Sequence, residues 1–376
     1  AMHRGDVDAP TRRSKRGLLP ATCPVPNVVW VVMLLAVFMF GCRTGQAPVV
    51  DFRPTWDIDR AEILEWHADD PAFEQDRALE ASGLAFDEDR LFVLSEKYAR
   101  LLVIDTEQSM AARAIRLRVP RYSELEGIAV RSSTSYLCDE AHATVHEIDL
   151  SDLDLGWALP SRRLHLQGLS VKGGKIGFEG VAVTPDARFL YLLLERSHRP
   201  DGGCESKVFR MRVSNDVLKA EGKPVLIALE DCSWRLTDLE LWHGRLLALK
   251  SQFPGNRYEV IAIDPDSRTW ESVLDLTDAL RSVTEDGWGN NVEGIAVSND
   301  GTLYLVSDNA VTGVIDDPEP PLTDERTLLM RIPLEGVDER DPLADGVRSR
   351  GPVESAGGAP GVVHASPAVG PVVRPI

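Results

Sequence analysis

The sequence has few aromatic residues and a shortage of positive charge. Phenylalanine, tryptophan and tyrosine make up 6% of the 376 residues, and 41 lysines and arginines stand against 59 aspartates and glutamates. The net charge of -18 repels the phosphate backbone of nucleic acids, so nucleic-acid binding is excluded as a function. The same surplus of carboxylates favours cations as ligands.

The sequence also lacks the short motifs that mark common catalytic and cofactor sites. It contains no Gly-x-Ser-x-Gly elbow, no phosphate-binding P-loop and no Cys-x-x-Cys pair. His142 and His146 are four residues apart, but four residues of a strand span about 13 Å, so we do not expect them to share a metal ion.

An apolar run of 13 residues, 28–40, lies between a basic cluster at 12–16 and the pair Gly41-Cys42. A helix of that length reaches about 20 Å, which is short of the roughly 30 Å hydrocarbon core of a membrane. We therefore predict that residues 1–41 are a lipoprotein-type signal peptide and that Cys42 is lipidated. The chain would then be exported and lipid-anchored in the bacterial cell envelope. Plain secretion or an uncleaved anchor is the alternative.

The two segments that flank the central region are poor in features that could build a core. Residues 42–60 are predicted to be a tether, and residues 337–376 a disordered tail rich in proline, glycine and alanine. Residues 1–41 carry a net positive charge, so their removal leaves a mature chain with a net charge of about -21. The folded domain is expected over residues 61–336.

The central region repeats a short pattern. Five segments align: Ser82-Gly-Leu-Ala-Phe, Glu126-Gly-Ile-Ala-Val, Glu179-Gly-Val-Ala-Val, Asp238-Leu-Glu-Leu-Trp and Glu293-Gly-Ile-Ala-Val. They are 44, 53, 59 and 55 residues apart, and each precedes turn residues and further short apolar runs. Short β-branched runs separated by turns are strands, and four strands in each repeat form a propeller blade. The sequence thus predicts an all-β fold, a single β-propeller of five four-stranded blades, with six as the alternative.

The last repeat is one strand short. Residues 61–66 (AEILEW) precede the first repeat and have no partner there. We expect this N-terminal strand to complete the last blade and close the propeller, which leaves no sheet edge exposed.

Strand direction gathers two sets of side chains at one mouth of the central channel. Residues that open the first strands and residues that end the second strands are 12 to 16 positions apart, the length of one hairpin. The first set is Ser82, Glu126, Glu179, Asp238 and Glu293. The second set is Glu96, Asp139 with Glu140, Glu195, Lys250 and Asp308. The long loops leave from the same face, where binding residues usually lie.

So many carboxylates at one mouth require compensation, since like charges at short range either keep a proton or hold a cation. Oxygen ligands suit hard divalent cations, and we predict that calcium is held here. The predicted metal ligands are Glu126, Glu179, Asp238, Glu293 and Asp308. Glu179 and Glu293 are the candidates for acid–base catalysis. The structural alternative is that these acids cap backbone N–H groups of neighbouring blades.

The cysteines and tryptophans add two smaller expectations. Export permits disulfides, and strand direction places Cys204 and Cys232 on the mouth face of the third blade, so we predict that they pair. Cys138 ends a strand on the same face and is the rival partner. Trp242 and Trp288 are expected to pack in the core or at an interface rather than to line the mouth.

These residues resemble the phytase-like family, described by the words "esterase-like activity of phytase", and its relatives in the SdiA-regulated group. The resemblance covers residues 76–334 and depends on SGLAFD, two EGIAV segments, GFEGVAVTPDARFLYLLLER, TDLELWHGRLLALK and NNVEGIAVSNDGTLYLVSDN. It implies an exported β-propeller with phosphoesterase activity. By motif, Glu126, Glu179, Asp238, Glu293 and Asp308 correspond to the acidic positions of the family. Lys250 departs from the pattern, and the aspartate-rich calcium cluster of bacterial propeller phytases is not recognisable.

Two functions follow from these observations. In the first, a divalent cation at the mouth binds the oxygens of a small phosphorylated ligand and activates a water, as in a metal-dependent phosphoric ester hydrolase. In the second, the protein is a monomeric, non-catalytic propeller that presents its mouth to a ligand or an envelope protein. Metal-dependent turnover of a phosphoester distinguishes the first function from the second.

Overall fold

The computed structural model describes residues 54–106, 110–151, 153, 159–169, 177–284, 286–289, 291–309 and 321–336. These residues belong to one compact unit. The expected signal peptide, the lipidation site Cys42 and the C-terminal tail lie outside the described residues. Within the described ranges, no helix is both long and apolar enough to span a membrane.

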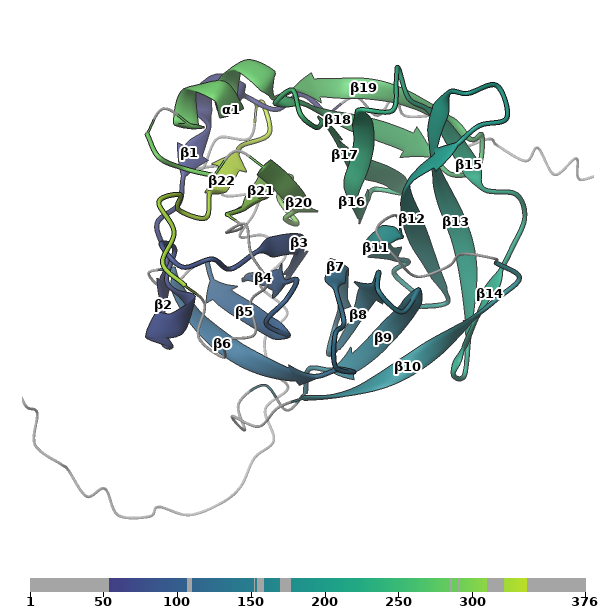
Figure 1. Cartoon of the computed structure of the whole chain (residues 1–376), viewed down its shortest axis with the longest axis horizontal. Helices are drawn as coiled ribbons and strands as arrows, with labels where there is room; N and C mark the ends of the chain where they lie inside the picture. The colour runs from purple at the N-terminus through teal and green to yellow at the C-terminus, as the bar shows by residue number, and fades with distance from the viewer. Residues whose placement is uncertain are drawn as a thin grey trace, which may run out of the picture. The chain divides into compact units, whose positions relative to one another are not determined.

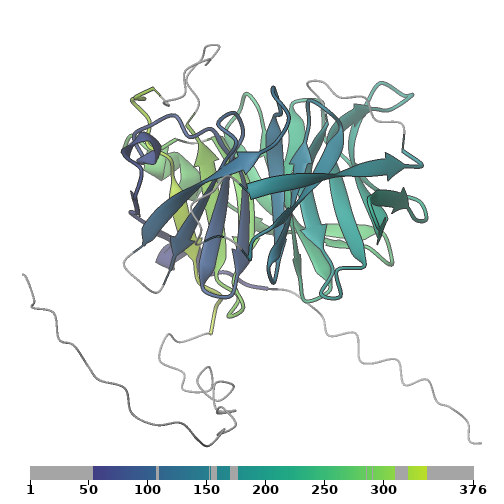
Figure 2. The same ribbon diagram turned by 90° about the horizontal axis from the view of Figure 1, so that it is seen from below.

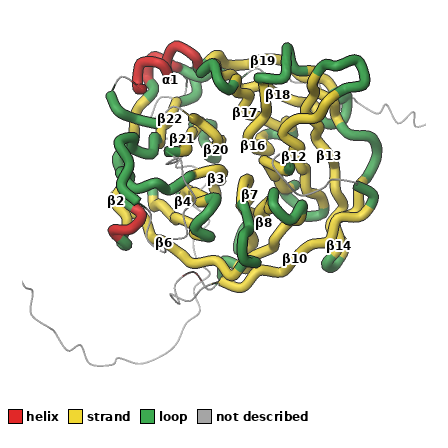
Figure 3. The backbone as a smooth tube through the Cα atoms, viewed as in Figure 1, coloured by secondary structure: helices red, strands yellow, loops and turns green. Residues whose placement is uncertain are grey.

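The strands form antiparallel groups in which successive strands pair through short connections (Figures 1 and 3). The first group contains β3 (Ala81–Asp87), β4 (Arg90–Ser95), β5 (Arg100–Asp105) and β6 (Ala111–Arg118). The second contains β7 (Leu125–Arg131), β8 (Thr134–Asp139), β9 (Thr144–Asp149) and β10 (Leu159–Gln167). The third contains β11 (Phe178–Val183), β12 (Phe189–His198) and β13 (Cys204–Ser214), and both β14 (Val217–Ala220) and β15 (Val225–Ala228) pair with β13.

The fourth group contains β16 (Trp234–Trp242), β17 (Arg245–Gln252), β18 (Arg257–Asp264) and β19 (Thr269–Asp275). The helix α1 (Thr277–Thr284) follows it, and the last group contains β20 (Asn291–Val297), β21 (Leu303–Asp308) and β22 (Leu329–Ile332). The first strands of the groups surround a common axis, each beside the next: β3, β7, β11, β16, β20 and again β3 (Figure 1). This is the expected β-propeller, and the number of blades stays a prediction.

An N-terminal strand closes the ring, as the sequence predicted. β1 (Glu62–Ile63) runs antiparallel to β22, with Ile63 opposite Met330. Arg331 forms an ion pair with Glu62 across the two strands, with 2.6 Å between the nitrogen and the oxygen. The next strand, β2 (His67–Ala68), was not expected and runs parallel to the outer strand β6 of the first group.

The folded part of the chain begins before residue 61, inside the segment that was expected to be a tether. Trp56 is buried, and its indole N–H donates to the carbonyl oxygen of Gly301 at 2.9 Å. Trp56 also forms a β-bridge with Leu334. A large indole with a satisfied N–H contributes substantial apolar burial, which explains why residues just before β1 are ordered against the last group.

The hydrophobic core is divided into layers between neighbouring groups of strands rather than concentrated in one centre. One layer packs Phe92 and Leu94 of the first group against Leu125 and Ile128 of the second. Comparable layers lie between each following pair of groups, including the pair that joins the last group to the first. Figure 2 shows that the strands run between the two faces of the ring. The layers therefore hold the strand ends, and the side chains on them, in a fixed arrangement around the axis.

Candidate functional site

Each inner strand carries a β-bulge close to its first residue. The register shifts lie between Ala81 and Gly83, Leu125 and Ile128, Phe178 and Gly180, Leu236 and Asp238, and Val292 and Gly294. The residues inside these shifts are Ser82, Glu126 with Gly127, Glu179, Thr237 and Glu293. Bulges redirect side chains, and here they coincide with the repeated acidic position of the sequence.

Asp238 does not lie in the register that the sequence alignment gave it. It pairs with Leu249 in the way that Gly180 pairs with Leu193 and Gly294 with Val306. Thr237 therefore takes the position that glutamate occupies in three other repeats, and Asp238 takes the glycine position. The alignment was one residue out in the fourth repeat, because its apolar pattern fits either register.

The Asp238 carboxylate lies at the axis and accepts hydrogen bonds from three inner strands. Its Oδ1 accepts from the backbone N–H of Leu239 at 2.8 Å. Its Oδ2 accepts from the N–H groups of Leu84 at 3.3 Å and Ile295 at 2.9 Å. Burial raises the pKa of Asp238, and these donors act in the opposite direction. Asp238 thus has the structural role that was the alternative to metal binding, because its carboxylate is used by backbone N–H groups of three strands.

Glycines let the inner strands come close enough for one carboxylate to reach three of them. A Cβ atom on Gly127 would lie 2.4 Å from the carbonyl oxygen of Glu179, and one on Gly180 would lie 2.8 Å from the nitrogen of Leu239. Both distances are below normal contact, so a side chain at either position would force the strands apart.

Seven carboxylates surround the end of the channel where the inner strands begin, and we name them the acidic mouth. They are Glu96, Glu126, Glu140, Glu179, Glu195, Glu293 and Asp308. Glu126 is only 7% exposed, and burial, reinforced by the charge of Glu179, raises its pKa. Burial and neighbouring carboxylates raise the pKa of Glu179 and Asp308 as well, and raise those of Glu96 and Glu140 to about 7.

Arg235 is a cation inside the acidic mouth that the sequence analysis missed. Arg235, on β16, contacts Glu293 at 2.8 Å and Glu195 at 3.5 Å. Although burial acts against its charge, these two glutamates raise the pKa of Arg235. Arg235 lies two residues before Thr237, where period-two alternation points it to the same side. The sequence feature that could have revealed this cation is an arginine two residues before the position that holds glutamate in other repeats.

Lys250 is not part of the acidic mouth. It is buried, and its Nζ donates to Glu230 at 2.7 Å and Glu259 at 2.6 Å. Ser251 instead pairs with Arg235 and occupies the register of the second-strand acids. The expected position was again one residue out in the fourth repeat.

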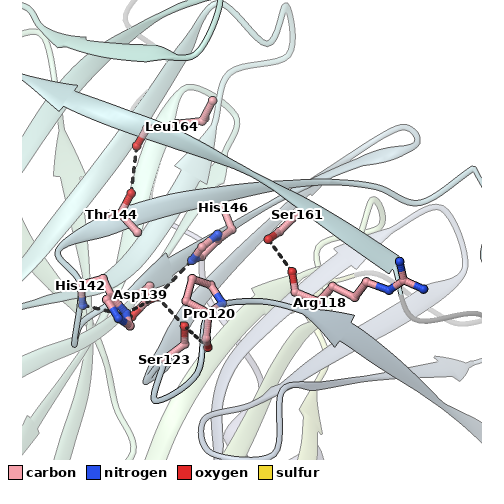
Figure 4. A network of polar contacts seen from close by, with 9 residues as sticks. All are labelled: Arg118, Pro120, Ser123, Asp139, His142, Thr144, His146, Ser161 and Leu164. Atoms are coloured by element: carbon pink, nitrogen blue, oxygen red, sulfur yellow. Dashed lines mark hydrogen bonds and ion pairs between the residues drawn. The ribbon is translucent and has the colours of Figure 1, made fainter.

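Asp139 also belongs to a different cluster, shown in Figure 4. Its carboxylate accepts from the Ser123 hydroxyl at 2.7 Å and contacts Nδ1 of His142 at 2.9 Å and Nε2 of His146 at 3.0 Å. Although burial acts to raise it, hydrogen bonds from His146 and Ser123 hold the pKa of Asp139 below its ordinary value. The two histidines therefore converge on one carboxylate, and the side chain of His142 is 32% exposed.

The cysteines pair as strand direction predicted, and both tryptophans pack against other side chains as expected. A disulfide joins Cys204 and Cys232, and Cys138 is buried and free. Trp288 is buried in the core layer between the fourth and last groups, and Trp242 packs beside Trp56 with 6.0 Å between ring centroids.

Several oxygen atoms at the acidic mouth are buried without a hydrogen-bond partner. Oδ2 of Asp308 accepts from Asn291 at 3.3 Å, but its Oδ1 is buried with no hydrogen-bond partner among the described residues. The hydroxyls of Thr237 and Ser251 are likewise buried and unpartnered within the described ranges. Buried polar atoms without partners call for a bound water or ion, and oxygen donors are the ligands that hard cations prefer.

The sequence matches the model of the phytase-like family, described as "Esterase-like activity of phytase", over residues 81–310. Solved structures with a similar arrangement include the Myxococcus xanthus glutaminyl cyclase, with 19% identity, a TM-score of 0.41, and 74% of this chain and 97% of that chain covered. The PQQ-bound aldose sugar dehydrogenase of Streptomyces coelicolor has 11% identity and a TM-score of 0.39, with 74% and 99% covered.

The Kuenenia stuttgartiensis hydrazine synthase is similar at 12% identity and a TM-score of 0.36. The match covers 61% of this chain and 56% of that chain, so it spans little more than half of the synthase. No match was found among curated proteins.

We predict that Asp238→Asn destabilises the fold. Whichever way the amide turns, its NH2 group meets at least one backbone N–H that has lost its acceptor, at a cost of about 1–3 kcal/mol. Thr237→Val is the matched isosteric control, because the Thr237 hydroxyl has no partner among the described residues. Urea unfolding of both variants measures the difference, and equal effects would contradict the role given to Asp238.

We also predict that the cation-free protein becomes less stable as the pH rises from about 5 to 8. Glu96 and Glu140 have pKa values of about 7 in the folded chain, above their ordinary 4.5. The folded state therefore binds more protons than the unfolded state in this window, and the free energy of unfolding falls with rising pH. Urea unfolding in chelator at several pH values tests this. Glu140→Gln should flatten the fall, and a wild type that gains stability would refute it.

Proposed function

Because the chain belongs to the phytase-like family, we propose that it is a divalent-cation-dependent phosphoesterase that acts at the acidic mouth. The observation that carries the proposal is the gathering of buried and half-buried carboxylates with raised pKa values at one end of the channel. Such a cluster either keeps protons or exchanges them for a cation.

Calcium is the cation that we propose, held by Glu126, Glu293 and Asp308, while Glu179 stays uncoordinated and can accept a proton. The unpartnered Oδ1 of Asp308 and the absence of nitrogen or sulfur among these donors support an oxygen-preferring ion. When bound, the cation would offset the negative charge of the mouth and polarise a phosphoryl oxygen.

The two predicted catalytic glutamates differ in their surroundings. Oε1 of Glu293 accepts hydrogen bonds from Arg235 at 2.8 Å and from Asn291 at 2.9 Å, which fix its position. For Glu179, burial together with the charges of Glu195 and Glu140 raises the pKa. A carboxylate with a raised pKa is the better proton acceptor, so we assign the general base to Glu179. Arg235 would help to hold the anionic substrate.

A second candidate function, a binding propeller without turnover, is supported by exposed apolar side chains on the loops of the mouth face. Tyr122 between β6 and β7 is 72% exposed, Phe253 after β17 is 60% exposed, and Leu322 before β22 is 65% exposed. An apolar rim around an acidic centre suits a partner that combines apolar groups with positive charge.

The calcium proposal predicts a stabilisation that depends on the acidic mouth. Calcium should raise the melting temperature of the wild type by mass action, and Glu293→Gln should lose most of that rise because it deletes one ligand charge. Glu240→Gln is the matched control, since Glu240 lies near the other end of the inner strand β16. Differential scanning calorimetry with calcium and with chelator measures both.

Turnover separates the two candidate functions. The phosphoesterase proposal expects release of phosphate or alcohol from a generic phosphoester in calcium, a loss of about 100-fold or more in kcat for Glu179→Gln, and no loss for Glu240→Gln. Calcium-dependent stabilisation without turnover would favour the binding function. Identical melting in calcium and in chelator would leave the mouth acids with a structural role and refute both the metal site and the hydrolase.

We further propose that the protein acts at the envelope through a lipid on Cys42. The motive is the short apolar run at 28–40 followed by Gly41-Cys42. Radiolabelled fatty acid should enter the wild type and should not enter Cys42→Ser. Label in both proteins, or in neither, would show that Cys42 is not the anchor.

A further inference from the structure

Three potential metal ligands meet on the mouth face at the third group of strands. His198 ends β12, Cys204 begins β13, and Cys232 lies in the connection from β15 to β16. Nδ1 of His198 lies 3.4 Å from Sγ of Cys204 and 3.9 Å from Sγ of Cys232. Among the described residues, these three side chains form a group of histidine, cysteine or acidic residues whose ligand atoms all lie within 4.8 Å of one another.

The distances from the imidazole to the two sulfurs are those of a zinc site. Zinc lies about 2.3 Å from a thiolate and about 2.05 Å from an imidazole nitrogen, so tetrahedral geometry separates the nitrogen from each sulfur by about 3.6 Å. The observed distances of 3.4 and 3.9 Å bracket this value. The two sulfurs are bonded to each other in the disulfide, and they would have to move apart to about 3.8 Å.

A cation is hydrogen-bonded to the backbone of one of the two cysteines. Nη1 of Arg196 donates to the carbonyl oxygen of Cys232. A nearby positive charge stabilises a thiolate, the form that binds metal. His198 is exposed and Cys204 is buried, so a metal ion can reach the imidazole from solvent while one sulfur stays shielded.

We propose that the reduced Cys204–Cys232 pair and His198 form a zinc site separate from the acidic mouth, and that the disulfide is its metal-free form. A dithiol reductant delivers two electrons and two protons to the disulfide, which becomes two thiols while the reductant becomes a disulfide. Zn²⁺ then displaces both thiol protons and is bound by two thiolates and by Nδ1 of His198. Three protein ligands leave the fourth position to water.

Cobalt binding to the full chain tests the proposal, because Co²⁺ bound to thiolates gives a ligand-to-metal charge-transfer absorption. After reduction with a phosphine, the wild type should show this absorption, zinc should remove it, and excess calcium should not. Cys204→Ser and Cys232→Ser should abolish it, and His198→Ala should weaken Co²⁺ binding roughly tenfold or more. The oxidised wild type should bind no cobalt in this way, and Cys138→Ser should behave as the wild type.

Three results would overturn the proposal. The first is a reduced wild type that keeps its β-sheet circular dichroism but shows no charge-transfer absorption. The second is an absorption that survives Cys204→Ser or is unaffected by His198→Ala, which would place the metal elsewhere. The third is a reduced chain that loses its β-sheet signal, which would make the disulfide a structural crosslink. Failure of the calcium site leaves each of these results interpretable, since calcium plays no part in them.

Discussion

The hydrogen bonds from three inner strands to the Asp238 carboxylate are the interaction on which the rest of the arrangement depends. β3, β16 and β20 belong to different groups, yet each donates a backbone N–H to this one side chain. Glycines at the corresponding positions of the other inner strands allow the close approach, because a Cβ on Gly127 or Gly180 would collide with the neighbouring strand. The Asp238 carboxylate thus joins three inner strands to one another at the axis, below the acidic mouth.

The bulges connect this level of the axis to the acidic mouth. Each bulge places one extra residue between the close-packed glycine position and the strand start, and in three strands that residue is a glutamate. The same backbone feature therefore brings the inner strands together and gathers carboxylates at their ends. Burial, reinforced by the neighbouring charges, raises the pKa values of these carboxylates, and such a cluster favours bound protons or a cation. Arg235 compensates part of the charge, since it contacts Glu195 and Glu293.

More of the fold than of the site could be predicted from the sequence, because the fold depends on repeated apolar runs and the site depends on the exact register of each strand. Strand order, the hairpin lengths and the closure by β1 follow from apolar runs and turns, which a repeated sequence displays several times. The fourth repeat was misplaced by one residue because Asp238-Leu-Glu-Leu alternates as well in either register, which also misplaced Lys250 and hid Arg235. The convergence of His142 and His146 on Asp139 could not be predicted, because it depends on how a turn after β8 folds back.

The end of β12 links the acidic mouth to the cysteine pair. Glu195 belongs to the mouth, Arg196 donates to the carbonyl oxygen of Cys232, and His198 contacts both sulfurs. Burial raises the pKa of Glu195, and the charges of Arg235 and then of Arg196 act in the opposite direction. Opening the disulfide to accommodate zinc would move Cys232, and with it the carbonyl that positions Arg196. In our proposal, a change at the sulfur pair therefore reaches the charge balance of the mouth through a single arginine.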